Sequence, residues 1–473
     1  MNNPGGSNRT DSVSLEEELR NLVGARSVEN VTRLSGGASR ETWSFLADSR
    51  PLILQRQRPG DVRDMLVEAR VLETAFDAGV RVPQLITSGE MSSGAKFMVL
   101  AHVPGETIAR KILRDERFSA ARPVLVEQMA RSLACLHAID ADSLSGLPSV
   151  DQLEQYRTTL DNLNSSLGQS HPAFELAFAW LERNRPASQR RSLVHGDFRL
   201  GNVMVDESGL AAVLDWELAH VGDPLEDLGW LCVRAWRFGS SLPVAGLGRY
   251  DELIAAYQKA SGVEISAEEV LWWEVLGTLK WGIMCMIQAS SHLLGHHRSH
   301  EMAAIGRRVC ENEYDLFLLL DGRWTSASKA TSPSSWNHPI VVDSDEPTVH
   351  DVPSTAQLVE AVREWMERDV MAGTTGRLQF HTRVAINALS IVEREMKSGR
   401  VQSRRHLERL AALGVAHDAE LADAIRSGRL DDRIDDVAHV VRDSVVDKVA
   451  VANPSYLLSV VPDDGAATDV SQA

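Results

Sequence analysis

One stretch of this 473-residue chain, residues 193–230, constrains its fold more than any other: LVHGDFRLGNVMVDESGLAAVLDWELAHVGDPLEDLGW. An apolar pair leads into a His-Gly-Asp triplet that ends at Asp197, and Asn202 opens a short apolar run five residues later. After a turn, a second apolar run ends on Asp215. Short apolar runs bounded by turn residues predict β-strands. Two short strands are therefore expected to carry three oxygen-bearing side chains at their ends.

This arrangement suits phosphoryl transfer. Such a reaction needs a carboxylate that orients the acceptor hydroxyl and hard oxygen ligands that hold Mg²⁺ on the phosphates. Protein kinases use a catalytic-loop Asp, an Asn five positions later and a downstream Asp. We therefore predict that Asp197 is catalytic and that Asn202 and Asp215 bind the metal. The alternative is a βα turn with acidic caps that fall at kinase spacing.

Three motifs together resemble the aminoglycoside phosphotransferase family, relatives of protein kinases that act on small molecules. The motifs are GGASRETW, LVHGDFRLGN and LDWELAHVGDPLEDLGW, and they look most like the kinase-type domains fused to some acyl-CoA dehydrogenases. The resemblance covers roughly the first two-thirds of the chain. It implies an α+β fold of the bilobal protein-kinase type, with a small β-rich N-lobe, a mainly helical C-lobe, and ATP and Mg²⁺ as cofactors.

The start of the chain predicts a sheet that covers the nucleotide. A glycine turn with Gly36, Gly37 and Ser39 lies between strands expected at 28–34 and 41–47. Glycine lets backbone N–H groups approach a phosphate without an intervening Cβ. We expect these three residues to bind the nucleotide.

The third strand, expected at 51–56, lacks the lysine that kinases use to contact the α- and β-phosphates, and Gln55 stands in its place. Neighbouring side chains on a strand face opposite sides unless the chain bulges. We favour Arg56 or Arg58 as the nucleotide-binding cation, with a surface arginine as the alternative. Glu68, on the next expected helix, is predicted to pair with that cation.

The interlobe hinge is expected where the strand pattern breaks, in the sequence Ala-His-Val-Pro-Gly at 101–105. Its free backbone edge, at Ala101 and Val103, would contact adenine. Helices are then expected at 121–137, 153–167, 174–183 and 301–320. His137, at the end of the first of these helices, is expected to be a hydrogen-bonded helix-end residue and not a catalytic group.

Two groups of side chains downstream allow alternative interpretations. Aromatic residues at helical spacing form either core or an acceptor pocket. Acidic residues after the second motif either bind a polycationic acceptor or cap helices. The first group is Trp236, Trp272, Trp273 and Trp281; the second is Asp223, Glu226 and Asp227.

Composition shifts along the chain predict its domains. We expect the N-lobe at 1–104, the C-lobe at 105–322, a Ser/Thr/Pro-rich linker at 323–353 and a separate all-α domain of unknown function at 354–473. One helix of that last domain carries four polar residues close together. They form either a polar site or a stripe that faces solvent or another subunit. A homo-oligomer through these helices is therefore one expectation. They are Arg377, His381, Arg383 and Asn387.

Charge and composition narrow the partners. The formal net charge of −17 opposes nonspecific attraction to nucleic acid or to an anionic membrane. The four cysteines have no CxxC spacing, so reduced thiols are expected. The first residues lack the apolar run of a secretion signal, and no long window is free of charges, so we expect a cytoplasmic protein without a membrane span.

These observations predict an ATP- and Mg²⁺-dependent phosphotransferase that moves the γ-phosphate to a hydroxyl of a small metabolite. The family resemblance favours a hydroxy acid or a hydroxyacyl-CoA as acceptor over an aminoglycoside or macrolide antibiotic. The alternative is a nucleotide-binding, catalytically weak regulatory or scaffold protein, and the missing third-strand lysine supports it.

Overall fold

The computed structural model describes residues 7–34, 40–58, 64–187, 190–336 and 353–458. They fall into two compact units. The first unit is formed by residues 1–151 and 186–274, and the second by residues 152–185 and 275–473. The helices between residues 152 and 185, expected in the C-lobe, thus group by contact with the C-terminal helices.

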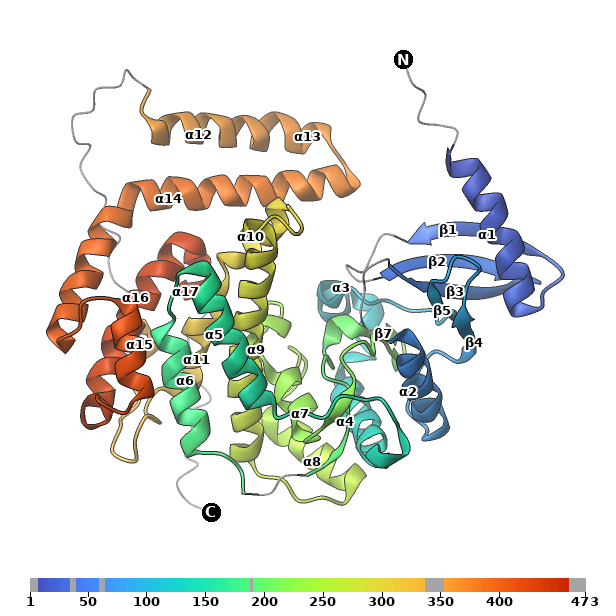
Figure 1. The fold of residues 1–473 in the computed structure, drawn as a ribbon, viewed down its shortest axis with the longest axis horizontal. Helices are drawn as coiled ribbons and strands as arrows, with labels where there is room; N and C mark the ends of the chain where they lie inside the picture. The colour runs from blue at the N-terminus through green and yellow to red at the C-terminus, as the bar shows by residue number, and fades with distance from the viewer. Residues whose placement is uncertain (1–6, 35–39, 59–63, 188–189, 337–352, 459–473) are drawn as a thin grey trace. The chain divides into compact units, whose positions relative to one another are not determined.

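The first unit begins with a five-stranded antiparallel sheet in the order β1-β2-β3-β5-β4 (Figure 1). Helix α1 contacts β1 and β4, and helix α2 contacts β4 and β5. These elements are α1 (Ser7–Val23), β1 (Val28–Leu34), β2 (Arg40–Ala47), β3 (Arg50–Gln57), α2 (Met65–Asp77), β4 (Leu85–Glu90) and β5 (Lys96–Ala101).

Side-chain alternation divides this sheet into two faces. Leu52 and Leu54 of β3 are buried in one apolar cluster with Leu19 of α1 and Phe45 of β2. Residues at odd positions of β3, such as Gln55, point to the opposite face. The sheet therefore has an α1-facing side that forms core and a second side on which polar groups are available.

The rest of the first unit carries the motif stretch on short strands and helices. Strands β6 and β9 pair antiparallel, as do β7 and β8, and α4 contacts β6, β8 and α8. Backbone hydrogen bonds in both directions join Glu106 to Val205, which ties the chain after β5 to β7. These elements are α3 (Ala109–Arg114), α4 (Arg122–His137), β6 (Ser192–Val194), β7 (Val203–Asp206), β8 (Gly209–Val213), β9 (His220–Gly222), α7 (Leu225–Cys232) and α8 (Tyr250–Ser261).

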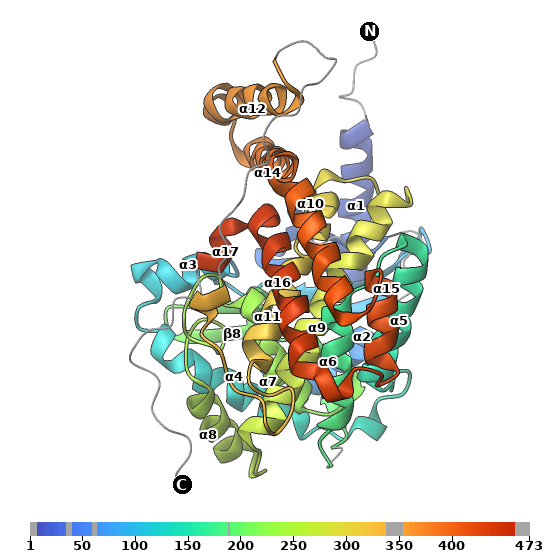
Figure 2. The same ribbon diagram turned by 90° about the vertical axis from the view of Figure 1, so that its left-hand side faces the viewer.

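The second unit is helical and contains most of helix α9 (Ala267–Leu293). Helix α16 contacts α6, α11 and α14, and α14 also contacts α10 and α12 (Figures 1 and 2). Its other helices are α5 (Gln152–Leu167), α6 (Pro172–Arg183), α10 (His300–Gly306), α11 (Val309–Leu320), α12 (Thr355–Trp365), α13 (Met371–Gly373), α14 (Gly376–Leu413), α15 (Asp418–Arg426), α16 (Ile434–Ala452) and α17 (Pro454–Leu458).

Two stretches of the second unit differ from expectation. The single helix expected at 301–320 is wrong, because α10 ends at Gly306 and α11 begins at Val309. A Cβ on Gly306 would lie 2.6 Å from the Cβ of Ala289, so α10 ends where it approaches α9 closely. Trp336, inside the expected linker, is buried and its ring lies 5.8 Å from that of Tyr314. The start of that segment therefore packs as core.

Helix α9 is long and apolar enough to cross a membrane by length and composition alone. However, 72% of its most apolar window is buried inside the protein, as in the core helix of a folded protein.

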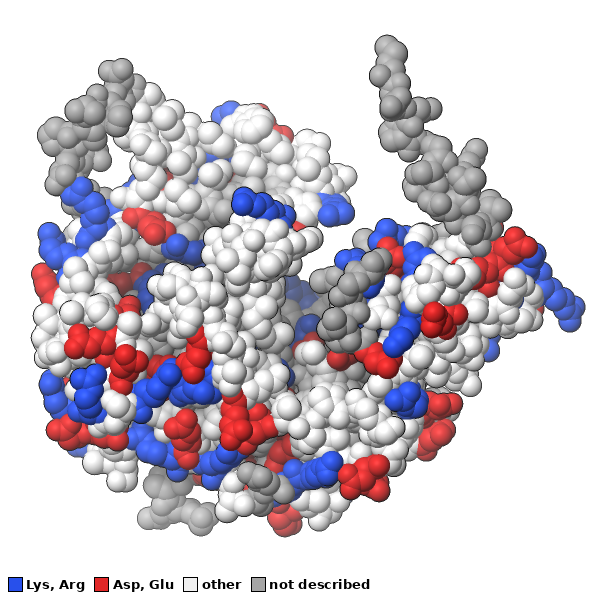
Figure 3. Space-filling model, in the orientation of Figure 1, with Lys and Arg blue, Asp and Glu red and all other residues white. Residues whose placement is uncertain are grey.

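On the face drawn in Figure 3, acidic and basic side chains are intermixed.

Candidate active site

Asp197 is held in one orientation by three donors. Nε1 of Trp230 donates to its Oδ1 at 2.8 Å, and Nε of Arg199 donates to the same oxygen at 3.0 Å. Nδ2 of Asn202 donates to Oδ2 at 2.5 Å. The Asp197 side chain still keeps 15% of its surface exposed. The carboxylate is thus both fixed and open to a reactant, as a catalytic base requires.

The two other predicted motif residues lie beside Asp197. The N–H of Leu214 donates to the carbonyl of Asn202 at 2.8 Å, so the residue before Asp215 is bound directly to Asn202. Asp215 has a φ of +64°, a left-handed conformation that is uncommon for a residue with a Cβ. Burial raises the pKa of the Asp215 carboxyl, and the nearby carboxylate of Glu217 raises it further. Amide and carboxylate oxygens in such an anionic setting fit a hard divalent cation.

Asp227 of α7 supports the loop that carries Asp197. Its carboxylate accepts hydrogen bonds from the backbone N–H of His195 at 2.8 Å and of Gly196 at 2.9 Å. Nε2 of His137 lies 3.2 Å from the same carboxylate. Burial opposes ionisation of Asp227, but these partners hold its pKa below the ordinary value. His137 also contacts the hydroxyl of Tyr257 at 3.0 Å, so it is hydrogen-bonded at the end of α4, as expected.

His195 orients the loop instead of exchanging protons. The N–H of Asp197 donates to its Nδ1 at 3.2 Å, which leaves the proton on Nε2, 2.9 Å from the carbonyl of Leu214. Its ring centroid lies 4.6 Å from that of Trp216. Burial lowers the pKa of His195, so the buried ring is neutral and bridges the two motif segments.

Glu68 of α2 pairs with an arginine that the sequence did not single out. Nη1 of Arg40, at the start of β2, donates to Glu68 at 2.6 Å, and Nη2 donates to Glu217 at 3.3 Å. The expected pairing of Glu68 with a third-strand cation is therefore wrong. Both Arg40 and Glu68 are buried. Burial raises the pKa of Glu68, and the Arg40 guanidinium opposes that rise.

Arg56 lies on the other face of the sheet. It is paired across the strands with Glu41 and forms an ion pair with it, on the side where Leu54 joins the α1 core. Arg58 is exposed just beyond β3. The structure thus places Arg56 away from Glu68, because alternation along β3 sends Gln55, not Arg56, to the α2-facing side.

The remaining predicted nucleotide contacts are at the ends of the sheet. Strand β5 ends at Ala101, whose N–H donates to the carbonyl of Gln84 at 2.9 Å, so the expectation that this N–H is free for adenine is wrong. Val103 follows in the connection to α3. Gly36, Gly37 and Ser39 lie outside the described residues, so their role stays a prediction.

Comparison with known proteins decides the family. The model of the phosphotransferase enzyme family matches residues 30–268, which is half of the chain. The chain belongs to this family. A second family model, a domain of unknown function (DUF6285), matches residues 372–456.

Two curated relatives of this phosphotransferase-family protein are acyl-CoA dehydrogenase family member 11 of Rattus norvegicus and member 10 of Mus musculus. Each is 29% identical to this chain; the matches cover 58% and 49% of this chain, but only 38% and 23% of the relatives. The chain thus spans about two-fifths of those relatives or less. A solved structure of a Ralstonia eutropha protein named as an aminoglycoside phosphotransferase has a TM-score of 0.54 at 21% identity, covering 65% of this chain and 98% of its own. The predicted fold class is confirmed.

The acidic residues and tryptophans whose roles the phosphotransferase sequence left open make structural contacts. The N–H of Leu225 donates to Asp223 at 2.9 Å, which caps α7, and Glu226 lies 2.9 Å from His220. Trp272 and Trp273 are buried in the core. Trp236 is buried as well, and the guanidinium of Arg199, a donor to Asp197, lies 4.7 Å from the centroid of its ring. These contacts support the fold of the site.

The second unit of the phosphotransferase chain contains a cavity of about 690 Å³. Its most buried charge is Glu313 of α11, which lies 2.9 Å from His171 and 3.2 Å from Lys448 of α16. Burial opposes ionisation of Glu313, but Lys448 and His171 lower its pKa to about 2. Arg307 and Glu395 of the lining form a second ion pair at 2.7 Å. The three residues predicted to carry phosphoryl transfer lie instead in the first unit.

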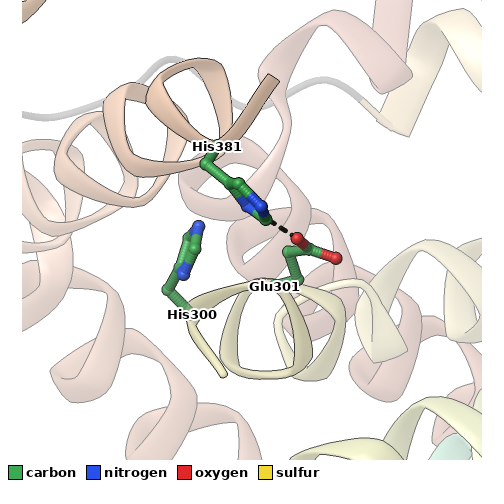
Figure 4. Close-up of side chains that lie close together, drawn as sticks. All are labelled: His300, Glu301 and His381. Carbon is green, nitrogen blue, oxygen red and sulfur yellow. Dashed lines mark ion pairs between the residues drawn. The ribbon is translucent and has the colours of Figure 1, made fainter. Parts of the chain in front are cut away.

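Three residues between α10 and α14 lie close together: His300, Glu301 and His381 (Figure 4). Nδ1 of His381 is 2.7 Å from Glu301, and Nε of Arg377 donates to Nε2 of His381 at 2.9 Å. Part of the predicted polar stripe therefore joins α14 to α10 through an Arg-His-Glu chain.

Proposed function

We propose that this protein is an ATP- and Mg²⁺-dependent kinase that transfers the γ-phosphate to a hydroxyl group of a small metabolite. Family membership supports this function. The observation that carries it is the grouping of Asp197 with Asn202 and Asp215 at the ends of short paired strands. Phosphoryl transfer depends on such positioning and charge neutralisation more than on covalent chemistry by the protein.

Each residue of the site has a distinct role in the proposed reaction. Asp197 orients the acceptor hydroxyl and takes up its proton. Its three hydrogen-bond donors hold the two carboxylate oxygens in one orientation. Asn202 and Asp215 would hold Mg²⁺, since their oxygens are the ligand type that this ion prefers. When bound, the metal neutralises charge on the phosphates. Asp227 and His195 keep Asp197 in place.

We further propose a hydroxy acid or a hydroxyacyl-CoA as the acceptor. Support comes from the sequence similarity to two acyl-CoA dehydrogenase family members. A polycationic antibiotic would need acidic side chains near the acceptor position, but Asp223, Glu226 and Asp227 are engaged in caps and hydrogen bonds. An aminoglycoside acceptor is therefore less well supported.

A nucleotide-binding regulator with weak catalysis is the second candidate, because Gln55 stands where kinases have a lysine. ATP consumption with a library of hydroxylated metabolites separates the two candidates. A kinase consumes ATP with one class of acceptor, whereas a regulator binds Mg²⁺-ATP without acceptor-dependent turnover.

The direct test of the catalytic assignment is Asp197→Asn. Loss of a positioned general base lowers turnover by about 10²- to 10⁴-fold, and we expect that loss with Mg²⁺-ADP binding retained. The measurements are acceptor-dependent ADP release and calorimetric ADP binding. The matched control, Glu207→Gln, changes a carboxylate that is 70% exposed on the nearby β7–β8 turn, and it should leave turnover unaffected. Full turnover by the Asp197→Asn protein would refute the role of Asp197.

A further inference from the structure

We propose that Arg40 of β2 supplies the positive charge for the nucleotide phosphates that protein kinases take from a lysine of the third strand. This inference rests on the proposed function, since it names the phosphate contact of the same site. It removes the objection that the chain lacks a nucleotide-binding cation.

The strand register places Arg40 on the correct face of the sheet. Arg40 is paired with Gln57 across the strands, and Thr42 is paired with Gln55. Cross-strand partners share a face, and positions two apart on one strand share it as well. Arg40 and Gln55 are therefore diagonal neighbours on the α2-facing side, opposite to the face of Arg56.

The contacts of Arg40 join the sheet to the metal end of the site. Its guanidinium donates to Gln55 at 3.1 Å, to Glu68 at 2.6 Å and to Glu217 at 3.3 Å. Glu217 is two residues beyond Asp215, the predicted metal ligand. Arg40 thus occupies the bridging position that a third-strand lysine has between the helix glutamate and the phosphates.

The local charge balance requires a cation at this position. Glu68 and Glu217 both accept hydrogen bonds from Arg40, and Asp215 stands two residues before Glu217. A polyphosphate approaching these carboxylates meets repulsion that only fixed positive charge or metal relieves. A guanidinium has five N–H donors, so Arg40 can hold two carboxylates and still donate to a phosphate oxygen.

The neutral side chain of Gln55, at the position of the kinase lysine, fits this role of Arg40. Its side-chain oxygen accepts from Arg40, so a neutral residue at the lysine position helps to orient the displaced cation. A lysine at 55 would instead place a second positive charge against the guanidinium. We therefore expect that Gln55→Lys can supply the positive charge from the third strand when Arg40→Gln has removed it from β2.

The experiment compares four full-length proteins: wild type, Arg40→Gln, the double variant Arg40→Gln with Gln55→Lys, and the matched control Arg56→Gln. Calorimetry measures the affinity of each protein for Mg²⁺-ADP and for adenosine, and thermal unfolding checks the fold. Adenosine lacks phosphates, so it reports the nucleoside part of the site alone.

We expect Arg40→Gln to weaken Mg²⁺-ADP binding by about 10- to 100-fold, as for loss of a charge-assisted contact, and adenosine binding by less than about threefold. The double variant should recover at least about tenfold of that loss, and Arg56→Gln should match wild type. Equal weakening of both ligands, or no recovery with Gln55→Lys, would show that Arg40 is only structural. Unchanged Mg²⁺-ADP binding by Arg40→Gln would overturn the Arg40 proposal alone. Absence of Mg²⁺-ADP binding by wild type would overturn the kinase proposal with it.

Discussion

At the scale of single residues, Gly196 shows how tightly the catalytic loop is built. Its φ is +79°, and a Cβ at this position would lie 2.5 Å from the carbonyl oxygen of Leu218. Its N–H donates to Asp227 at 2.9 Å. Only glycine combines this backbone conformation with this close approach, so the residue before Asp197 has no side chain for steric reasons.

Gly196→Ala is expected to destabilise the first unit and to lower turnover. The left-handed backbone alone costs about 1–2 kcal/mol for a residue with a Cβ, and the clash with the Leu218 carbonyl adds to that cost. The matched control is Gly262→Ala, because Gly262 has a φ of +71° but no atom within 4 Å of an added Cβ. Chemical denaturation measures both proteins. Equal losses of stability would mean that the close approach does not matter.

At the scale of elements, α7 positions the site from one face. Asp227 and Trp230 are three residues apart, so they lie on the same side of this helix. The first binds two backbone N–H groups of the catalytic loop, and the second donates to Asp197 itself. A single short helix therefore holds both the backbone and the side chain that the reaction needs.

Asp227→Asn is expected to lower stability by about 2 kcal/mol, because a buried carboxylate that accepts several hydrogen bonds is replaced by a group with fewer acceptor sites. Turnover should fall by about tenfold as the loop loosens. The control is Asp251→Asn, which changes an acidic residue 68% exposed in the first turn of α8 and should shift stability by less than about 0.5 kcal/mol. Urea unfolding and ADP release are measured for both variants. Wild-type turnover by Asp227→Asn would argue against a positioning role for α7.

At the scale of the whole molecule, charge pairs join helices of the second unit that are far apart in sequence. Glu313 of α11 contacts Lys448 of α16, and Arg426 of α15 contacts Glu175 of α6 at 2.7 Å. Glu175 is fully enclosed, and so is Glu313. Breaking a buried pair leaves an uncompensated charge, so these contacts connect the C-terminal helices firmly to α6 and α11.

Glu313→Gln is expected to lower the free energy of unfolding near pH 7 by about 3 kcal/mol, since it leaves Lys448 without its buried partner. The pKa of Glu313 is about 2 in the folded protein and 4.5 in its ordinary state. A carboxyl group whose pKa is lowered in the folded state stabilises the fold at pH values above its ordinary pKa. This contribution to stability is lost as the pH falls from about 4.5 to about 2. The stability difference between wild type and variant should therefore shrink over this pH range.

Urea unfolding at several pH values measures that difference. The control is Glu182→Gln, because Glu182 is 59% exposed and lies 3.8 Å from Arg157. It should change stability by less than about 1 kcal/mol at any pH. A gap between wild type and Glu313→Gln that stays constant from pH 7 to pH 2 would contradict the assigned pair.

Local patterns determined much of this protein. Apolar runs and turn residues predicted the first three strands of the first sheet to within one residue at each end. Motif spacing identified Asp197, Asn202 and Asp215, which the structure brings together. Both kinds of inference succeed because short-range backbone geometry sets strand periodicity, and because a strand end places its next side chain at the sheet edge.

Tertiary structure alone decided three matters. Only the register of β2 against β3 shows that Arg40 faces Glu68 while Arg56 faces α1. Only packing shows that α10 and α11 are separate helices and that Trp336 is core. Only long-range hydrogen bonds show that Asp227 supports the catalytic loop. A sequence records alternation along each strand or helix, but which face meets which neighbour depends on contacts between residues far apart in the chain.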